Sequence, residues 1–548
     1  MSRAAKTSPM DSESAAPSRR WPSIGVWFPA VSIAFAGAAT AAAVALVDNS
    51  QGLMLMVVGV ILIAALLEVL AWLLVFSGYA WRRRVAGLLI IVAVLGAVGA
   101  SLRIEGLSGD LIPRLSWRWI PPKNAALDLE SPVAPRTESR GVIDLEMTTA
   151  HDYAQFLGAD RTSRVEAVTL GRDWSSAPKT RWRHPVGKGW SSFAIVGRYA
   201  LTQEKRGSQE ATVCYELDSG RTVWTHPQKG TFESRVAGDG PRATPTVAEG
   251  RVYVMSSLGR LDCLAGENGS LIWSRDVVKE NGGQLLMWGH ACSPLVVGRL
   301  VVASGGAPDG RLLAAYDKET GQPAWTSGHD HASYSSPTFA TLCGMPQIMI
   351  VSASRVAAHG VEDGKELWAV PWPKEPIDNP NVSQPVSLDE DRVFLSSGYG
   401  VGCAVLQLTR GNEGIFSVAT VWENRHLKTK FTNVVVRNGF VFGLDEGVLT
   451  CVNLADGRRR WKAGRYGHGQ VLLVGELIIV QAESGEVALV EATPARHSEL
   501  GRFQALDDKT WNNPAFSAPY LLVRNDQEAA CYELPLAELA VPKGHAAR

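Results

Sequence analysis

Three long apolar stretches open the chain, before any alternating pattern begins. Residues 24–47 contain no charged side chain, residues 52–76 contain only Glu68, and residues 85–102 are again uncharged. A helix needs about 20 apolar residues to cross the hydrocarbon core of a membrane. The pattern therefore predicts three transmembrane helices, and the first is too long for the apolar part of a cleaved signal peptide.

The basic residues around these stretches predict their orientation. Loops rich in Arg and Lys stay on the cytoplasmic side, and the short loop around Asp48 has no basic residue. We therefore expect residues 1–23 to be a cytoplasmic tail and the chain after residue 103 to lie in the periplasm, anchored to the bacterial plasma membrane. The basic residues concerned are Arg3, Lys6, Arg19, Arg20, Arg82, Arg83 and Arg84.

Glu68 is the one carboxylate within these stretches, and it has two interpretations. An acid at this depth can belong to an ion or proton path, which would make transport a remote third function. The other interpretation is a protonated or snorkelling side chain, which we favour because the other stretches offer no charged partner. Residues 103–150, rich in proline and charge, are expected to form an extended periplasmic linker.

From residue 151 onward the pattern changes to short alternating segments. RVYVMS (251–256), RLVVAS (299–304) and RVFLSS (392–397) each follow a tight turn, and such alternation predicts strands. An aromatic residue recurs every 39 to 54 residues, which is the length of one four-stranded propeller blade. These positions are Trp182, Trp224, Trp273, Trp325, Trp368, Trp422, Trp461 and, with a substitute, Phe503.

A glycine precedes most of these tryptophans by four residues, as in GSLIW (269–273). Glycine suits a hairpin turn with positive φ, and the Trp is then expected on the outermost strand, where it packs against the next blade. We interpret the seven tryptophans as a structural belt. Residues 180–185 resemble an outer strand without inner partners, and residues 520–534 lack an outer strand. Joining them predicts an eight-bladed all-β propeller over residues 151–540, followed by a tail at 541–548.

The seven cysteines add little chemistry to this picture. Cys214, Cys263 and Cys451 each stand six residues before the repeat glycine, where other units have alanine. Equivalent positions on different blades are not expected within disulfide range, so we predict buried free thiols. The sequence has no CxxC motif, and His329 and His331 form a weak pair without an evident third ligand. No metal site is expected.

Composition narrows the range of partners. The chain has 54 basic and 54 acidic residues among 548, so its formal net charge is zero. A nucleic-acid-binding face would need an excess of positive charge. We expect the membrane and other envelope proteins as partners, and no nucleic acid.

The blade ends follow the pattern A-x-[D/E]-x-G-x3-W, as in AGENGSLIW (265–273). This pattern resembles the pyrroloquinoline-quinone (PQQ) repeat of quinoprotein alcohol dehydrogenases and BamB-like assembly factors, over about residues 150–540. DYAQFLGADR (152–161) also looks like the lead-in of planctomycete-type, membrane-anchored PQQ-like proteins. The resemblance implies an eight-bladed propeller.

Two departures from the quinoprotein pattern bear on function. The chain has no adjacent cysteine pair, which these dehydrogenases carry over the quinone, and no recognisable counterpart of their calcium ligands. We therefore expect a non-catalytic scaffold that binds protein or another ligand on the periplasmic side, without a cofactor. The alternative is a PQQ- and calcium-dependent dehydrogenase or sensor of alcohols or sugars.

Ligands of propellers bind near the central channel, where the inner strands begin. Here these strands are expected after X-Pro steps such as Thr244-Pro245 and Ser293-Pro294. Side chains just upstream should face the funnel and could bind an anionic or planar ligand, or they could only line a wet channel. The candidates are Trp190, Arg242, His290, Tyr334, Asn381, Lys430, His468 and Trp511.

Overall fold

The computed structural model describes residues 25, 27–46, 51–129, 136–137, 143–146, 148–149, 151–166, 168–373 and 380–537. The chain divides into two compact units, one comprising Met1–Ile104 and Leu115–Ile120, the other Glu105–Arg114 and Pro121–Arg548. The tails expected at residues 1–23 and 541–548 lie outside the described residues.

The first unit contains three helices, α1 (Trp27–Leu46), α2 (Gln51–Ala71) and α3 (Trp81–Ser101). A π-helical turn, η1 (Trp72–Phe76), continues α2. Two stretches, Val57–Phe76 and Trp81–Ser101, are long and apolar enough to cross a membrane, whereas the corresponding stretch of α1, Trp27–Ala42, is shorter. The structure therefore does not confirm three transmembrane helices. Glu68 is exposed on α2.

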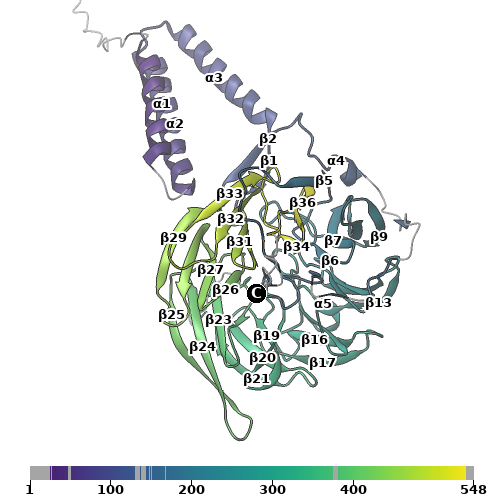
Figure 1. Ribbon diagram of the computed structural model, residues 1–548. Coiled ribbons are helices and arrows are strands. Elements are labelled where there is room, and N and C mark those ends of the chain that lie inside the picture. The colour runs from purple at the N-terminus through teal and green to yellow at the C-terminus, as the bar shows by residue number, and fades with distance from the viewer. Residues whose placement is uncertain are drawn as a thin grey trace, which may run out of the picture. The chain divides into compact units, whose positions relative to one another are not determined.

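The second unit is an eight-bladed β-propeller, as expected, and Figure 1 shows its blades arranged around a central axis. Each blade has four antiparallel strands that pair in order from the axis outward. The first four blades contain β6 (Ala194–Val196), β7 (Tyr199–Arg206), β8 (Gln209–Glu216) and β9 (Thr222–Gln228); β10 (Thr246–Ala248), β11 (Arg251–Met255), β12 (Arg260–Ala265) and β13 (Leu271–Asp276); β14 (Leu295–Val297), β15 (Leu300–Ser304), β16 (Leu313–Asp317) and β17 (Pro323–Ser327); and β18 (Thr338–Leu342), β19 (Met345–Val351), β20 (Arg355–Gly360) and β21 (Glu366–Pro371).

The remaining blades complete the ring. They contain β22 (Val386–Ser387), β23 (Arg392–Ser397), β24 (Gly402–Arg410) and β25 (Phe416–Asn424); β26 (Val434–Arg437), β27 (Phe440–Asp445), β28 (Val448–Asn453) and β29 (Arg459–Arg465); β30 (Gln470–Val474), β31 (Leu477–Gln481), β32 (Glu486–Glu491) and β33 (Glu499–Gln504); and β34 (Ala515–Ser517), β35 (Tyr520–Arg524), β36 (Glu528–Glu533) and β5 (Lys179–Pro185).

The last blade is composite, because β5 comes from the N-terminal side of the propeller. β5 pairs antiparallel with β36, so the first outer strand closes the sheet formed by the last three strands. This pairing confirms the predicted closure, which removes the free edge that an open ring would leave. Further short elements are β1 (Leu102–Leu107) paired with β2 (Pro113–Trp117), β3 (Arg136–Thr137) beside β9, β4 (Arg164–Val165) beside β30, and the helices α4 (Ala125–Leu129) and α5 (Val277–Glu280).

The hydrophobic core lies between neighbouring blades. Val302 and Ala315 of one blade, for example, share a buried cluster with Ile348 and Ile350 of the next. Alternate side chains of each strand therefore face one neighbouring blade or the other, and both faces of most inner strands are buried. This explains why the strands are more continuously apolar than half-exposed strands would be.

The belt tryptophans lie on the outer strands and contact the following blade. Nε1 of Trp224 donates to the carbonyl of Gly266 at 2.9 Å, and Nε1 of Trp273 donates to that of Lys318 at 3.0 Å. A Cβ built on Gly269 would lie 2.5 Å from the ring of Trp224. The glycine therefore serves both its turn, at φ +73°, and the stacking of the preceding blade's tryptophan.

A small residue lies opposite most belt tryptophans in the strand register. Cys214 pairs with Trp224, Cys263 with Trp273, and Ala315 with Trp325. All seven cysteines are free thiols, and six of them are buried. The expectation of buried thiols at a small-residue packing position is therefore confirmed for these positions, since a larger side chain would collide within the blade.

Candidate functional site

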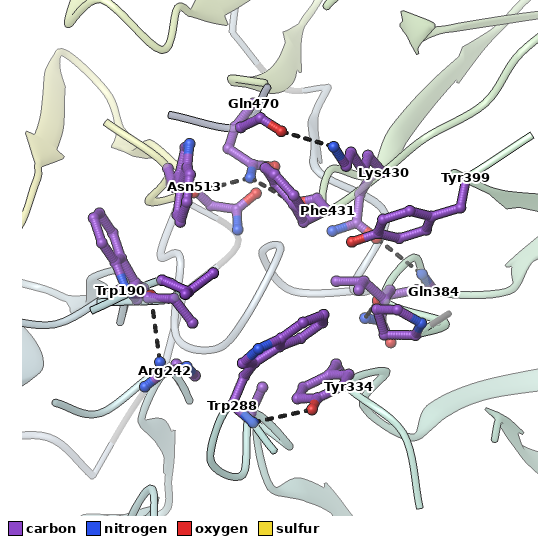
Figure 2. Close-up of a pocket in the computed structure, with 18 of the residues that line it drawn as sticks. Trp190, Arg242, Trp288, Tyr334, Gln384, Tyr399, Lys430, Phe431, Gln470 and Asn513 are labelled. Atoms are coloured by element: carbon purple, nitrogen blue, oxygen red, sulfur yellow. Dashed lines mark hydrogen bonds between the residues drawn. The ribbon is translucent and has the colours of Figure 1, made fainter. Parts of the chain in front are cut away.

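A chamber of about 400 Å³ lies on the propeller axis. Its wall is largely aromatic, and most of its side chains come from the loops that precede the inner strands of successive blades (Figure 2). Tyr399 comes instead from the turn between β23 and β24. Such a wall can take the face of a planar or apolar group, while the cations near it can meet negative charge. The aromatic lining residues are Phe156, Trp190, Trp288, Tyr334, Tyr399, Phe431 and Trp511.

Five of the eight residues predicted from the sequence line this chamber, namely Trp190, Arg242, Tyr334, Lys430 and Trp511. The other three do not line it.

The remaining three candidates lie in the wall or at its edge. His290 is 1% exposed, and burial lowers its pKa to about 4. Asn381 is buried, where its amide donates to the carbonyls of Ser352 and Trp372. Nε2 of His468 lies 3.1 Å from the Asp110 carboxylate. Asn381 thus holds loop carbonyls, and His290 is buried, so neither side chain is open to a ligand.

Arg242 lines the chamber, but its guanidinium is already engaged. It donates to the carbonyls of Gly240 at 2.5 Å and Gly238 at 2.8 Å, and it stacks 4.9 Å from the ring centroid of Phe232. Burial lowers its pKa to about 10. The side chain therefore fixes the loop that carries Ala237, which in turn accepts a hydrogen bond from the indole of Trp190.

Besides Arg242, two lysines, Lys430 and Lys509, place cations at the mouth of the chamber. Nζ of Lys430 lies 5.3 Å from the ring centroid of Tyr399 and 5.6 Å from that of Phe431. Nζ of Lys509 lies 4.0 Å from the ring of Trp511 and 4.8 Å from that of Trp190. Burial lowers the pKa of Lys509 to about 8. These cation–π contacts hold two ammonium groups at an aromatic surface.

The amide side chains of the chamber wall mainly fix the strand ends. Nε2 of Gln470 donates to the carbonyls of Phe431 and Trp511, at 3.0 and 2.9 Å. Oε1 of Gln384 accepts from the backbone N–H of Ser336 at 2.8 Å. Buried backbone groups at the strand ends require hydrogen-bond partners, and these amide side chains supply them. This explains why the sequence has many polar residues at the funnel.

Arg161 closes the propeller axis among the starts of several inner strands. Its side chain is 3% exposed and donates to the carbonyls of Ser293, Pro294 and Pro337, which come from two different blades. Phe156 of the same lead-in segment, residues 152–161, lines the chamber. The segment that resembles a family lead-in therefore acts as a plug of the axis.

The lining residues give no support to a metal centre. All the side chains that line the chamber are apolar, aromatic, neutral polar or cationic, so a calcium ion there would lack carboxylate ligands. Among the residues that the structure describes, no three His, Cys, Asp or Glu side chains are grouped to hold a metal ion. His329 and His331 are exposed, whereas Asp330 between them anchors Ser352 and Ser354.

Several residues in the chamber wall or against it were not anticipated from the sequence. Lys509 was missed although it stands two residues before the predicted Trp511, and Trp288 stands two residues before His290. An i to i+2 spacing alone would not have identified both, because Trp288 lines the chamber whereas His290 is buried in its wall. Ser108, Gly109 and Leu111 gave no such signal, since they belong to the expected linker.

The comparisons with known proteins agree with the architecture. Residues 209–463 match the family model described as outer membrane protein assembly factor BamB. A quinohemoprotein alcohol dehydrogenase, ADH-IIG of Pseudomonas putida, is 34% identical over 121 residues, which is 21% of this chain and 16% of that protein. The match thus spans about a sixth of that relative's length.

Two solved structures are similar to this chain at low sequence identity. BamB from Moraxella catarrhalis has a TM-score of 0.47 and 12% identity, covering 65% of this chain and 100% of its own. The quinohemoprotein alcohol dehydrogenase of Comamonas testosteroni has a TM-score of 0.50 and 12% identity, covering 71% and 82%. Together with the repeat motif and the eight closed blades, the match of residues 209–463 supports a PQQ-repeat β-propeller.

Proposed function

We propose that the protein is a membrane-anchored, PQQ-like propeller that binds a protein or another ligand at its central chamber and catalyses no reaction. In this proposal the N-terminus is cytoplasmic and the propeller is periplasmic, as the distribution of basic loops favours. The observation that carries it is the chamber itself, an aromatic cavity of about 400 Å³ with Lys430 in its wall. Aromatic walls and a few charged groups are typical of binding sites.

The chemistry of the lining supports binding more than catalysis. None of the side chains lining the described chamber is a carboxylate, and its histidine neighbour His290 has a lowered pKa and is buried. General acid–base catalysis needs a titratable group within hydrogen-bond reach of the substrate. Lys430 and the Tyr334 hydroxyl can instead hold an anionic or polar group against the aromatic wall.

The first experiment asks whether the chamber is the binding site. Full-length protein is captured from crosslinked native membranes and compared with Ala291→Phe, which fills the chamber from its wall. Leu271→Phe on the outer strand β13 is the matched control, because its side chain is 45% exposed and distant from the chamber lining. We expect specific partners with wild type and with the control, and their loss with Ala291→Phe. Equal recovery from all three proteins would contradict binding at the chamber.

A PQQ-dependent dehydrogenase is the second candidate, favoured by the identity with a quinohemoprotein alcohol dehydrogenase over 121 residues. PQQ is a planar tricarboxylate, so Lys430 and the aromatic wall suit its body and its charge. The calcium that supports the quinone finds no carboxylate among the residues lining the chamber, and Arg242 is engaged by loop carbonyls. The described residues therefore fit the full quinone–calcium group poorly.

Reconstitution separates the two candidates. Wild-type protein is titrated with PQQ and Ca²⁺, and both quinone absorbance and dye reduction with alcohols and sugars are measured. We expect no turnover. Dye reduction that requires both PQQ and Ca²⁺, and that is weakened by Lys430→Ala, would replace the scaffold proposal with the dehydrogenase.

A further inference from the structure

Residues 105–114, which we call the strap, lie at the mouth of the chamber. Three of its residues, Ser108, Gly109 and Leu111, line the chamber, and Gly109 is buried. The turn is closed by hydrogen bonds from the N–H of Leu111 to the carbonyl of Ser108 and from that of Ser108 to the carbonyl of Ile112, both at 2.9 Å. Part of the expected linker thus packs on the propeller.

The propeller recognises the backbone of the strap as well as one side chain. Nζ of Lys430 donates to the carbonyl of Gly109 at 2.7 Å, and Nζ of Lys509 donates to that of Leu107 at 3.1 Å. Oε1 of Glu483 accepts from the N–H of Gly109 at 2.6 Å. The two lysine donors and the Glu483 acceptor are therefore spaced to match the carbonyl and N–H groups of a peptide backbone.

The site fits the Gly-Asp pair of the strap closely. A Cβ built on Gly109 would lie 2.1 Å from Cδ2 of His468, so only glycine fits beneath the imidazole. The next residue, Asp110, places its carboxylate 3.1 Å from Nε2 of His468. The hydrogen bond with His468 lowers the pKa of Asp110, which keeps this group acidic. Glycine supplies the close approach and aspartate supplies the charge.

Glu483 ties these contacts to the aromatic wall. Its Oε1 also accepts from the indole of Trp511 at 2.9 Å, and its Oε2 accepts from the N–H of His468 at 3.0 Å. These hydrogen bonds hold the Glu483 carboxylate in position. The group that accepts from the peptide N–H is therefore ordered before a peptide binds. Ordered polar groups of this kind reduce the free-energy cost of binding.

We propose that this mouth is a binding site for an acidic Gly-Asp turn in a peptide segment of a partner protein, and that the strap occupies it in cis as a competing ligand. The proposal rests on the proposed binding function and names the class of partner and its regulation. A free dicarboxylate could satisfy the two lysines, but it offers no N–H to Glu483. The backbone contacts therefore favour a peptide.

The strap also explains how the site would be kept closed. A peptide from a partner must displace residues that are covalently attached and always present. If the strap occupies the site about 90% of the time, the apparent affinity for the partner falls about tenfold. Any event that withdraws residues 105–114 from the mouth would then restore the full affinity.

Binding of a labelled peptide to the full-length protein in detergent tests the competition. The probe is fluorescent EGLSGDLIPR, the sequence of residues 105–114, measured by anisotropy. Gly109→Ala in the chain forces the strap from beneath His468, whereas Gly411→Ala is the matched control, because its new Cβ would lie an ordinary 3.6 Å from the carbonyl oxygen of Ile415. We expect Gly109→Ala to bind the peptide about tenfold more tightly than wild type and the control.

Hydrogen exchange and two further substitutions test whether the strap and the peptide use the same contacts. Hydrogen exchange should show the Gly109 and Leu111 amides protected in wild type, and residues 105–114 unprotected in Gly109→Ala. In the Gly109→Ala background, Glu483→Gln should weaken the peptide, and a peptide with alanine for glycine should not bind. Equal peptide affinity in wild type and Gly109→Ala, or equal binding of the alanine peptide, would overturn the proposal.

Competition with succinate separates a peptide from a small anion. Displacement of the peptide by succinate at equal concentration would show that the site recognises carboxylates without the peptide backbone. This result would overturn the peptide inference. If Ala291→Phe loses its partners but the peptide never binds, the strap inference fails while the proposed function stands. If the peptide binds but the membranes yield the same partners with and without Ala291→Phe, chamber binding fails instead.

Discussion

Cys531 on β36 lies directly opposite Trp182 on β5, so residues almost 350 positions apart in the sequence share one register. Beside this pair, Arg183 donates to both carboxylate oxygens of Glu528, each at 2.8 Å. The closure of the propeller therefore combines a buried aromatic contact with a bidentate ion pair. Bidentate pairs of this kind are stronger and more directional than single ones.

Replacing Glu528 with Gln should destabilise the closure. Its side chain is 4% exposed and also accepts from Lys123 at 2.8 Å, so the change leaves Lys123 and Arg183 with Asp507, the more exposed of their two carboxylate partners. We expect a loss of about 2–4 kcal/mol in the free energy of unfolding, measured by denaturant titration. Glu166→Gln is the control, since its side chain is 72% exposed, and it should change stability little.

The same carboxylate predicts a dependence on pH. Burial alone would raise the pKa of Glu528, but hydrogen bonds from Arg183 and Lys123 outweigh it, and the pKa lies below its ordinary value. The folded chain therefore holds this proton less tightly than the unfolded chain, so stability falls as the pH drops through the lowered pKa. Wild type should lose stability in this acidic range, whereas Glu528→Gln should lose less; parallel curves would contradict the assignment.

Gly269→Ala should show how much the tryptophan belt depends on its glycines. The new Cβ would lie 2.5 Å from Trp224 at a backbone φ of +73°, so steric overlap adds to conformational strain. We expect a loss of about 2–4 kcal/mol. Gly439→Ala has a similar φ of +79° but no atom within 4 Å, and it should lose only about 1 kcal/mol. Similar losses of unfolding free energy in the two variants would show that contact with Trp224 does not cause the destabilisation.

Arg161→Met should destabilise the propeller axis. The change would strand the carbonyls of Ser293 and Pro337, which the buried guanidinium now satisfies at 3.1 and 2.9 Å. We expect a loss of about 3 kcal/mol or more by denaturant titration. Arg161→Lys should recover little of this stability, because one ammonium group cannot replace a planar guanidinium that donates to several carbonyls. Arg164→Met, at a partly exposed side chain, is the control.

Lys509 predicts a second dependence on pH, in the alkaline range. Its pKa falls to about 8 in the folded chain because of burial, so the folded chain binds fewer protons than the unfolded chain above that pH. Wild type should therefore gain about 2–4 kcal/mol between pH 8 and the ordinary lysine pKa of about 10.5. Lys509→Met should lack this gain, whereas Lys365→Met, at an exposed position, should keep it.

The repeat made the propeller predictable, because each blade carries its own signals. Turn glycines, alternating strands and outer tryptophans recur in one order, and the unmatched segments at 180–185 and 520–534 indicate their own pairing. The funnel was predictable only in part. Trp190 and Trp511 were found because they precede strand starts, whereas the burial of His290 depends on how neighbouring loops pack.

The strap could not be predicted from local pattern. Its sequence, EGLSGDLIPR, has the glycine and proline content of a flexible linker, and a linker was expected. Its order comes from distant residues, Lys430, Glu483 and His468, which the fold gathers at one mouth. Such contacts have no periodicity in the sequence, so only the tertiary structure reveals them.

The pairing of β5 with β36 also has a consequence for biogenesis. Lys179–Pro185 emerges from the ribosome early, but its partner Glu528–Glu533 is among the last strands to be made. The early strand must therefore wait with an exposed edge while seven blades are synthesised and, in the proposed topology, exported. A chaperone that shields strand edges during translocation would protect this interval, and a chain that stalls before its final blade would remain open to proteolysis.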